Sequence, residues 1–176
     1  MSKTNTPELP QLLHLQSKPR YEPLRVLMVC TGNICRSPTA HGVLEKMVAE
    51  AGLSERISVD SAGTHGYHVG GAPDQRSQQH AALRGYDLSQ QRARQLRSQD
   101  FKQFDLVLIM DDANEAAASS ICPPAEAHRM LRLTDFCQQF QTNEVPDPYY
   151  GGDQGFEQVL DLIEDACTGV LTVLKR

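Results

Sequence analysis

A cysteine and an arginine six positions apart carry the first sign of chemistry in this chain. The stretch VCTGNICRSP runs over residues 29–38 and places Cys30 at the end of an apolar run, with Arg36 and Ser37 following. A cysteine thiolate is a strong nucleophile, and the guanidinium of an arginine can hold two oxygens of a phosphate at once. This spacing predicts a nucleophile and an anion-binding group on one loop.

The residues between them suit a loop that wraps an anion. Gly32 and Asn33 tolerate positive φ better than most residue types, so successive backbone N–H groups can turn inward as a nest. A helix that begins near Ser37 adds its positive N-terminal end. The nest, the helix end and Arg36 together favour the thiolate form of Cys30. No Gly-Lys-Ser/Thr occurs, so this is not the nucleotide-binding P-loop.

The elements around this loop alternate between strand and helix. Short apolar segments predict strands over Leu24–Val29, Ile57–Ser61, Asp105–Met110 and His128–Leu133. Apolar positions at helical spacing predict helices over Ser37–Ala51, Asp74–Arg84, Asp112–Ser120 and Gln154–Leu174. This order predicts an α/β fold, a single three-layer domain with a central four-stranded parallel sheet flanked by helices. Sites in such sheets lie at the carboxyl ends of strands, where Cys30 falls.

Length and composition are those of one folded domain. The chain has 176 residues, of which 40% are hydrophobic and 22% charged. Residues 1–23 precede the first strong strand and are rich in Pro, Thr, Ser and Gln. We expect them to form a loose, flexible N-terminal extension, although Leu12, Leu13 and Leu15 could dock on the domain formed by residues 24–176.

Charge and cysteine usage exclude several classes of partner. The formal net charge of −5 argues against a nucleic-acid-binding surface, which needs a basic face. No apolar run approaches the ~18 residues needed to span a bilayer, and we find no signal peptide. Five cysteines without an export signal fit a reducing compartment, so we expect a cytoplasmic protein with no membrane association. The cysteines and histidines show no zinc spacing, and His65, His68 and His80 are expected to be loop or surface residues.

The full string CTGNICRSP is much more specific than a cysteine and an arginine alone. It resembles the low molecular weight protein tyrosine phosphatase family, and further segments in the family's order extend the resemblance to the C-terminus. These are SAGT (Ser61–Thr64), GAPDQRS (Gly71–Ser77), ARQ (Ala93–Gln95), DLVLIMDDAN (Asp105–Asn114) and VPDPYYGG (Val145–Gly152). The resemblance implies a flavodoxin-like fold of the phosphotyrosine phosphatase I type, and hydrolysis of phosphotyrosine monoesters through a phosphocysteine without metal or other cofactor. The partners it implies are phosphotyrosine proteins, a bacterial-type tyrosine kinase among them.

The resemblance also gives roles to individual residues. Asp147 matches the family's general acid, which protonates the leaving oxygen and later activates water. Ser37 matches the residue that hydrogen-bonds the nucleophilic sulfur, and Asn33 matches the one that fixes the loop. Tyr149 and Tyr150 could wall the pocket and stack on a substrate ring. The expected catalytic residues are Cys30, Arg36 and Asp147; the expected phosphate- and substrate-binding residues are Thr31, Gly32, Asn33, Ile34, Cys35, Ser37, Tyr149 and Tyr150.

Some positions depart from the family pattern or invite a second role. A larger apolar residue often follows the nucleophile, so Thr31 is expected to alter substrate preference. Gln91 stands where a histidine commonly supports the loop asparagine; it can hydrogen-bond but cannot titrate. A reversible disulfide between Cys30 and Cys35 would protect the nucleophile from over-oxidation. Asp111 follows a strand end near the site and could support the loop.

Three other functions remain open at this point. Arsenate reductase on the same fold needs two further cysteines close together, whereas Cys122 and Cys137 are fifteen residues apart. Protein-arginine phosphatase carries a threonine where this chain has Ile34. A non-catalytic phosphate-binding module is the third, and the presence of all three key groups, Cys30, Arg36 and Asp147, argues against it.

Overall fold

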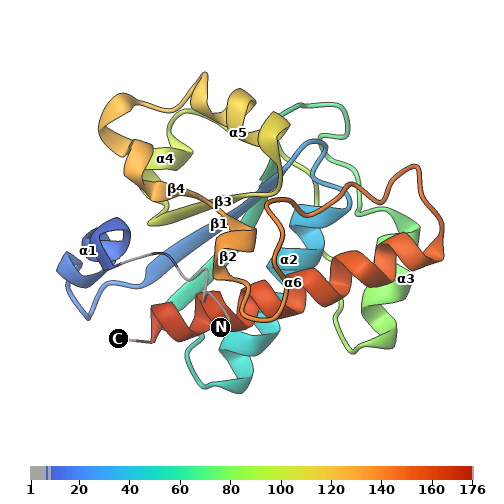
Figure 1. Cartoon of the computed structure of the whole chain (residues 1–176), viewed down its shortest axis with the longest axis horizontal. Helices are drawn as coiled ribbons and strands as arrows, with labels where there is room; N and C mark the ends of the chain where they lie inside the picture. Colours follow the sequence, from blue (N-terminus) through green and yellow to red (C-terminus); the bar gives the residue numbers. More distant parts are fainter. Residues whose placement is uncertain (1–6, 8, 176) are drawn as a thin grey trace.

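Four parallel strands form the centre of the computed structural model, which describes residue 7 and residues 9–175 (Figure 1). Their order across the sheet is β2-β1-β3-β4, and each neighbouring pair is parallel. The predicted α/β fold with a four-stranded parallel sheet is confirmed. The strands are β1 (Leu24–Cys30), β2 (Ile57–Gly63), β3 (Leu106–Ile109) and β4 (Met130–Arg132).

Helices cover both faces of this sheet. In Figure 1, α2, α3 and α6 lie on one side of the strands, and α4 and α5 lie on the other. The α-helices are α1 (Leu9–Ser17), α2 (Arg36–Glu50), α3 (Gln75–Leu83), α4 (Asp100–Gln103), α5 (Asp112–Ser119) and α6 (Asp153–Leu174). Two 3₁₀ helices, η1 (Pro124–Arg129) and η2 (Leu133–Phe136), flank β4.

Strand β1 is buried on both faces. Val26 and Met28 belong to the core that α2 and α6 cover, whereas Leu27 and Val29 belong to the core beneath α4 and α5. Alternate side chains therefore enter opposite cores. This explains why the segment reads as a continuous apolar run rather than as an alternating pattern.

Turn residues end the helices where the sequence places them. Gly52 and Gly85 follow α2 and α3 with φ of 70° and 86°, a conformation that other residues adopt only under strain. Asp74, predicted to open the third helical segment, caps α3 by accepting hydrogen bonds from the backbone N–H groups of Arg76 and Ser77. Strand β2 continues two residues beyond its predicted end at Ser61, to Gly63.

The predicted loose extension is corrected from Leu9 onward, where the chain forms helix α1. Leu12 and Leu15 are buried in the core that α2 and α6 share, as their docking would require. Beyond the helix, Lys18 Nζ lies 2.8 Å from the carboxylate of Asp105, at the start of β3. Apolar side chains three residues apart on one helical face thus fasten a segment whose composition indicated disorder. The prediction for residues 1–6 and 8 lies outside the described residues.

Helix α6 is the longest helix and is amphipathic. Its buried side chains, including Phe156, Val159, Leu160 and Ile163, recur at helical spacing along 22 residues. Within residues 9–175, no helix has the length and apolar character needed to cross a membrane.

The burial of α1 predicts an unequal effect of two neighbouring leucine substitutions. Leu15 is 2% exposed and Leu13 is 56% exposed. We expect Leu15→Ala to lower the free energy of unfolding by about 2–4 kcal/mol, because it empties a core position, and Leu13→Ala to change it by less than ~0.5 kcal/mol. Urea unfolding of both variants tests this, and equal effects would contradict the docked helix.

Candidate active site

A cavity of about 290 Å³ opens at the carboxyl end of β1 and contains most of the predicted site residues. It joins the loop after β1 to Asp147, which lies more than a hundred positions later in the chain. Asn33 and Ser37 are buried beneath it, with exposed fractions of 2% and 0%. The lining residues are Cys30, Thr31, Gly32, Ile34, Cys35, Arg36, Tyr67, His68, Asp147, Tyr149 and Tyr150.

The loop after β1 turns its backbone N–H groups inward. The carbonyl oxygens of Cys30, Thr31 and Ile34 accept hydrogen bonds of 2.8, 3.0 and 2.8 Å from backbone N–H groups of residues 64, 65 and 74. In a trans peptide the C=O and the following N–H point in opposite directions, so the N–H groups of residues 31, 32 and 35 face the inside of the loop. Together with the N-terminus of α2, they form the predicted anion nest.

A chain of side chains fixes the sulfur of Cys30. The Ser37 hydroxyl lies 3.0 Å from Cys30 Sγ, and Asn33 Nδ2 donates to Ser37 Oγ at 2.8 Å. Asn33 Oδ1 accepts from the backbone N–H of Arg94 at 3.0 Å, which orients the amide. Ser37 Oγ accepts from Asn33, and its single proton has two acceptors within reach, Cys30 Sγ and the Ala62 carbonyl at 3.4 Å.

Asn33 is the residue in this loop with a left-handed backbone. Its φ is 57°, as the sequence allowed, whereas Gly32 does not adopt positive φ. Asparagine tolerates this conformation better than most side chains do. The same residue therefore makes the turn and supports Ser37.

Arg36 is buried, with 2% of its side chain exposed, and its guanidinium is held from three sides. Nη1 donates to Asp111 Oδ2 at 2.6 Å and to the Val145 carbonyl at 3.0 Å, while Nη2 donates to Thr31 Oγ1 at 3.4 Å. Burial alone would lower the pKa of this group, but Cys30 and the carboxylates of Asp111 and Asp147 raise it. The predicted support of the loop by Asp111 is thus present as a direct contact with Arg36.

Asp147 lies across the cavity from the cysteine loop with its carboxylate half-exposed. Its Oδ2 is 3.7 Å from Arg36 Nη2, and its Oδ1 accepts from the backbone N–H of Tyr149 at 3.0 Å. Arg76 in turn donates to the Tyr149 carbonyl at 2.9 Å and lies over the tyrosine ring. Tyr149 and Tyr150 pack edge to face with their ring centroids 4.8 Å apart, so one wall of the cavity is aromatic.

Comparison with known proteins agrees with this geometry. The family model described as low molecular weight phosphotyrosine protein phosphatase matches residues 25–176. The chain belongs to this family. The phosphatase is 42% identical over 155 residues to a low molecular weight protein-tyrosine-phosphatase of Streptomyces coelicolor, a match that covers 86% of this chain and 94% of the relative. It is 38% identical over 148 residues to the low molecular weight phosphotyrosine protein phosphatase of Homo sapiens, covering 83% and 92%.

The fold of the phosphatase also matches a solved structure. A protein tyrosine phosphatase from Entamoeba histolytica superposes with a TM-score of 0.82 at 41% sequence identity. The match covers 85% of this chain and 95% of the other. The family and fold that the sequence motifs implied are therefore confirmed.

Thr31 and Gln91, the two departures from the family pattern, each make contacts that the sequence did not indicate. Thr31 lines the cavity, and its hydroxyl accepts from Asn114 Nδ2 at 3.1 Å as well as from Arg36, so it also braces the guanidinium. Gln91 does not reach Asn33; its amide nitrogen donates to the Pro38 carbonyl at 3.0 Å, on the first turn of α2. The backbone of residue 94 takes over the support of the asparagine, which explains how the phosphatase keeps its loop without the family's histidine.

Tyr67 and His68 are lining residues that the sequence did not single out. His68 was expected to be a loop or surface residue; it does lie in the loop after β2, but it lines the cavity and approaches Gly32. Tyr67 is 72% exposed at the rim and stacks on His65, with ring centroids 5.0 Å apart. The one sequence signal was position, since this loop follows the carboxyl end of a strand next to β1.

Gly63, which ends β2, and Gly66, in the loop after it, provide a matched test of the geometry next to the anion nest. A Cβ on Gly63 would lie 2.8 Å from the Thr31 carbonyl oxygen and 3.1 Å from the Asn33 nitrogen, both backbone atoms of the anion nest. A Cβ on Gly66 would also meet an atom at 2.8 Å, but that atom is the flexible end of Gln95.

We therefore expect Gly63→Ala to lower kcat/KM for p-nitrophenyl phosphate by about 10-fold or more, because displacing the nest misplaces the phosphate. Gly66→Ala should retain kcat/KM within about 2-fold, because a side-chain end can move aside. Steady-state kinetics on both variants give the comparison. Equal losses would contradict the close approach of β2 to the nest.

Proposed function

We propose that this chain is a protein-tyrosine phosphatase that hydrolyses phosphotyrosine monoesters, with Cys30 as nucleophile, Arg36 as phosphate ligand and Asp147 as general acid and base. The observation that carries the proposal is the meeting of these three groups at one cavity, over an inward-facing nest of N–H groups.

In the first step, Cys30 Sγ attacks phosphorus opposite the ester oxygen. The S–P bond forms, the P–O bond to the tyrosine ring breaks, and Asp147 donates its proton to the leaving phenolate. The nest amides and Arg36 hold the three equatorial oxygens while charge redistributes among them.

In the second step, water attacks the phosphocysteine. Asp147, now a carboxylate, takes a proton from the water, the O–P bond forms, and the S–P bond breaks. The sulfur leaves as a thiolate, and the Ser37 hydroxyl, 3.0 Å away, stabilises it by donating a hydrogen bond. Inorganic phosphate is then released.

The walls of the cavity support an aromatic phosphate as substrate. Tyr67, Tyr149 and Tyr150 line the rim with Ile34, a set suited to a flat ring above the phosphate. Related structures carry ligands of fitting chemistry: the Entamoeba histolytica phosphatase has Hepes in its active site, and Wzb of Vibrio vulnificus, 28% identical to this chain, is in complex with benzylphosphonate. Both ligands present a tetrahedral oxyanion.

The other activities left open by the sequence fit the site less well. An arsenate reductase relay needs further reactive thiolates, but burial raises the pKa of Cys137 to about 12. Apolar Ile34 stands where an arginine phosphatase has threonine. We place the protein in the cytoplasm, where its five free cysteines would stay reduced. Phosphotyrosine proteins, a bacterial-type tyrosine kinase among them, are the proposed partners.

Substitutions at the two reacting groups test the mechanism. Cys30→Ser should abolish turnover of p-nitrophenyl phosphate while phosphate binding persists, because the nest and Arg36 remain. Asp147→Asn should lower kcat/KM for a phosphotyrosine peptide by about 100-fold or more, since general acid catalysis contributes about 10²–10⁴-fold. Activity that survives Cys30→Ser would contradict the nucleophile.

Substrate class is tested on one protein sample. Phosphotyrosine, phosphoserine and phosphoarginine peptides of matched sequence are compared by phosphate release, with arsenate-dependent thiol oxidation as a fourth measurement. We expect the phosphotyrosine peptide to be preferred by its kcat/KM. A preference for phosphoarginine, or thiol oxidation by arsenate, would reassign the activity.

Cys35 is proposed as a redox guard for Cys30. Burial raises its pKa to about 12, so it is a neutral thiol at pH 7 and does not compete as nucleophile. When peroxide oxidises Cys30 to a sulfenic acid, attack by Cys35 forms an S–S bond and breaks the S–O bond; the hydroxyl leaves as water with the Cys35 proton.

We expect the wild-type protein to regain most activity with a dithiol reductant after peroxide treatment, and Cys35→Ser to regain little. Activity assays after timed peroxide exposure, with mass spectrometry of the disulfide, measure this. Recovery that does not depend on Cys35 would refute the guard.

A further inference from the structure

We propose that Arg132 is a positioning residue for the phosphatase reaction, because it clamps the segment that leads into Asp147 against α5. The proposal rests on the role of Asp147 given above. Arg132 ends β4, fifteen residues before Asp147 and outside the substrate cavity. Its effect must therefore pass through the chain that it holds.

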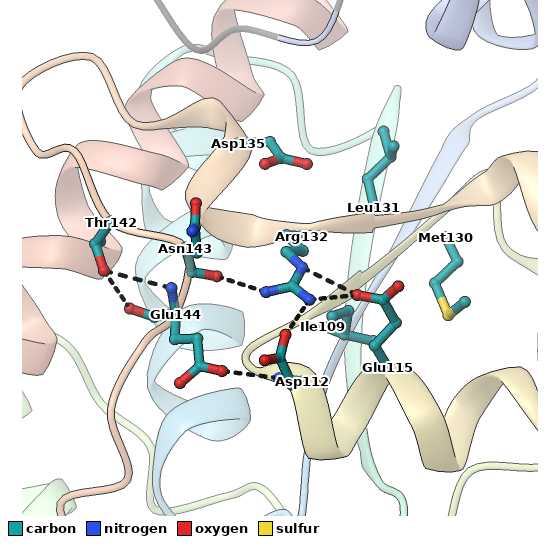
Figure 2. Close-up of a pocket in the computed structure, with 10 residues that line it drawn as sticks. All are labelled: Ile109, Asp112, Glu115, Met130, Leu131, Arg132, Asp135, Thr142, Asn143 and Glu144. Carbon is teal, nitrogen blue, oxygen red and sulfur yellow. Dashed lines mark hydrogen bonds and ion pairs between the residues drawn. The ribbon is translucent and has the colours of Figure 1, made fainter.

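Figure 2 shows the Arg132 guanidinium at the centre of this clamp, between α5 and the segment of residues 142–144. Nη1 donates to the Asn143 carbonyl at 3.1 Å. On the other side, Nε donates to Glu115 Oε2 at 3.0 Å, and Nη2 contacts the carboxylates of Asp112 and Glu115. One side chain thus joins β4, α5 and the segment before Val145.

A second contact fastens the same segment independently of Arg132. Glu144 Oε1 accepts from the backbone N–H of Asp112 at 3.1 Å, at the first turn of α5. Thr142 Oγ1 donates to the Glu144 carbonyl at 3.1 Å, which rigidifies the turn. The segment is therefore held at both Asn143 and Glu144.

The clamp is adjacent in sequence to Val145, whose carbonyl holds Arg36. Val145 follows Glu144 directly; its N–H donates to the Met110 carbonyl at 2.8 Å, and its own carbonyl accepts from Arg36 at 3.0 Å. Asp111, which precedes Asp112, holds the other side of Arg36. Two of the three supports of Arg36 are thus neighbours in sequence of residues in the clamp, and Asp147 follows Val145 by two residues.

The exposure of the clamp argues for a role in position rather than in stability. The side chain of Arg132 is 23% exposed, that of Glu115 is 47% and that of Asp112 is 77%. Ion pairs this exposed contribute about 1 kcal/mol or less. Their geometry is nevertheless specific, because a planar guanidinium reaches a carbonyl and two carboxylates in fixed directions.

The clamp also explains the acidic cavity of about 800 Å³ beside it. Arg132, Asp112, Glu115, Asn143 and Glu144 all line this cavity, and Figure 2 shows the Arg132 guanidinium between the carboxylates of Asp112 and Glu115 and the backbone carbonyl of Asn143. Two of its carboxylates, Asp112 and Glu115, are engaged by Arg132, and Asp135 also lines the cavity. We therefore assign these side chains to holding the segment and not to a second ligand.

The test compares two leaving groups in the full-length chain. Tyrosine leaves as a phenolate of pKa about 10 and needs a proton from Asp147, whereas p-nitrophenolate is a much weaker base and leaves with little help. We expect Arg132→Gln to lower kcat/KM for the phosphotyrosine peptide by about 10-fold and for p-nitrophenyl phosphate by about 2-fold or less. In an Asp147→Asn background, the same substitution should lower kcat/KM for the peptide by less than about 2-fold.

Controls separate positioning from loss of structure. Arg84→Gln removes a cation with three carboxylate partners on α6, Glu157, Asp161 and Glu164, and should leave the leaving-group ratio unchanged. Thermal unfolding of each variant checks the fold. If Arg132→Gln does not fold, the double variant Asp112→Asn, Glu115→Gln cuts the clamp from the α5 side and should reproduce the split between substrates.

Two results would overturn the inference. One is an equal loss on both substrates, or no loss, in a folded Arg132→Gln protein. The other is a full 10-fold loss that persists in the Asp147→Asn background. A wild-type protein that turns over neither substrate would instead contradict the proposed function, so the two failures are distinguishable.

Discussion

The buried guanidinium of Arg36 is the constraint on which the rest of this structure depends. A cation with 2% of its side chain exposed must have partners, and Asp111, the Val145 carbonyl and Thr31 supply them. Removing one partner from a buried ion pair costs about 3–5 kcal/mol. Three chain segments therefore meet at Arg36: the loop after β1, the residue before α5, and the segment of residues 145–147.

The remaining geometry of the site follows from that meeting. In the segment of residues 145–147, Asp147 Oδ2 lies 3.7 Å from Arg36 Nη2. The position of the proposed general acid relative to the proposed phosphate ligand is therefore set by the same contacts. Because Gly63 has no side chain, the chain after β2 comes close to the nest, and the N–H groups of residues 64 and 65 donate to the carbonyls of Cys30 and Thr31. Asn33 makes the turn that brings Ser37 beneath the sulfur. Gly63 and Asn33 thus serve the anion nest through the backbone conformation that they allow and not through a charge.

Local sequence pattern was enough to predict the four strands, the helices α2, α3, α5 and α6, and the first half of the site. The apolar run of β1, the turn residues Gly52 and Gly85, and the C-x5-R spacing each report on neighbours within a few positions, and all appear in the fold as expected. Asp147 came from resemblance, because a DP pair alone is also a common turn. The phosphocysteine chemistry, like the residue roles, stays a prediction until the substitutions are measured.

What could not be predicted depends on long-range contacts. The bond between Arg36 and Val145 spans 109 positions, and that between Asn33 and the backbone of residue 94 spans 61. No local rule says which basic residue will find such a partner, so Arg132 looked like any surface arginine. Helix α1 was missed for a related reason, because its Pro- and Gln-rich surroundings suggested disorder. Leu12 and Leu15 pack into a core formed by residues far along the chain, which the local sequence does not reveal.

That helix has a consequence for how this domain tolerates change. The family match begins at residue 25, after α1, yet Leu12 and Leu15 enter the same core cluster as Cys30. They add apolar burial to this core from outside the residues that the family model matches. Most substitutions destabilise a protein and are lost once its stability falls below a threshold. The apolar burial of α1 therefore adds to the margin by which this domain exceeds that threshold, in the same core that carries Cys30.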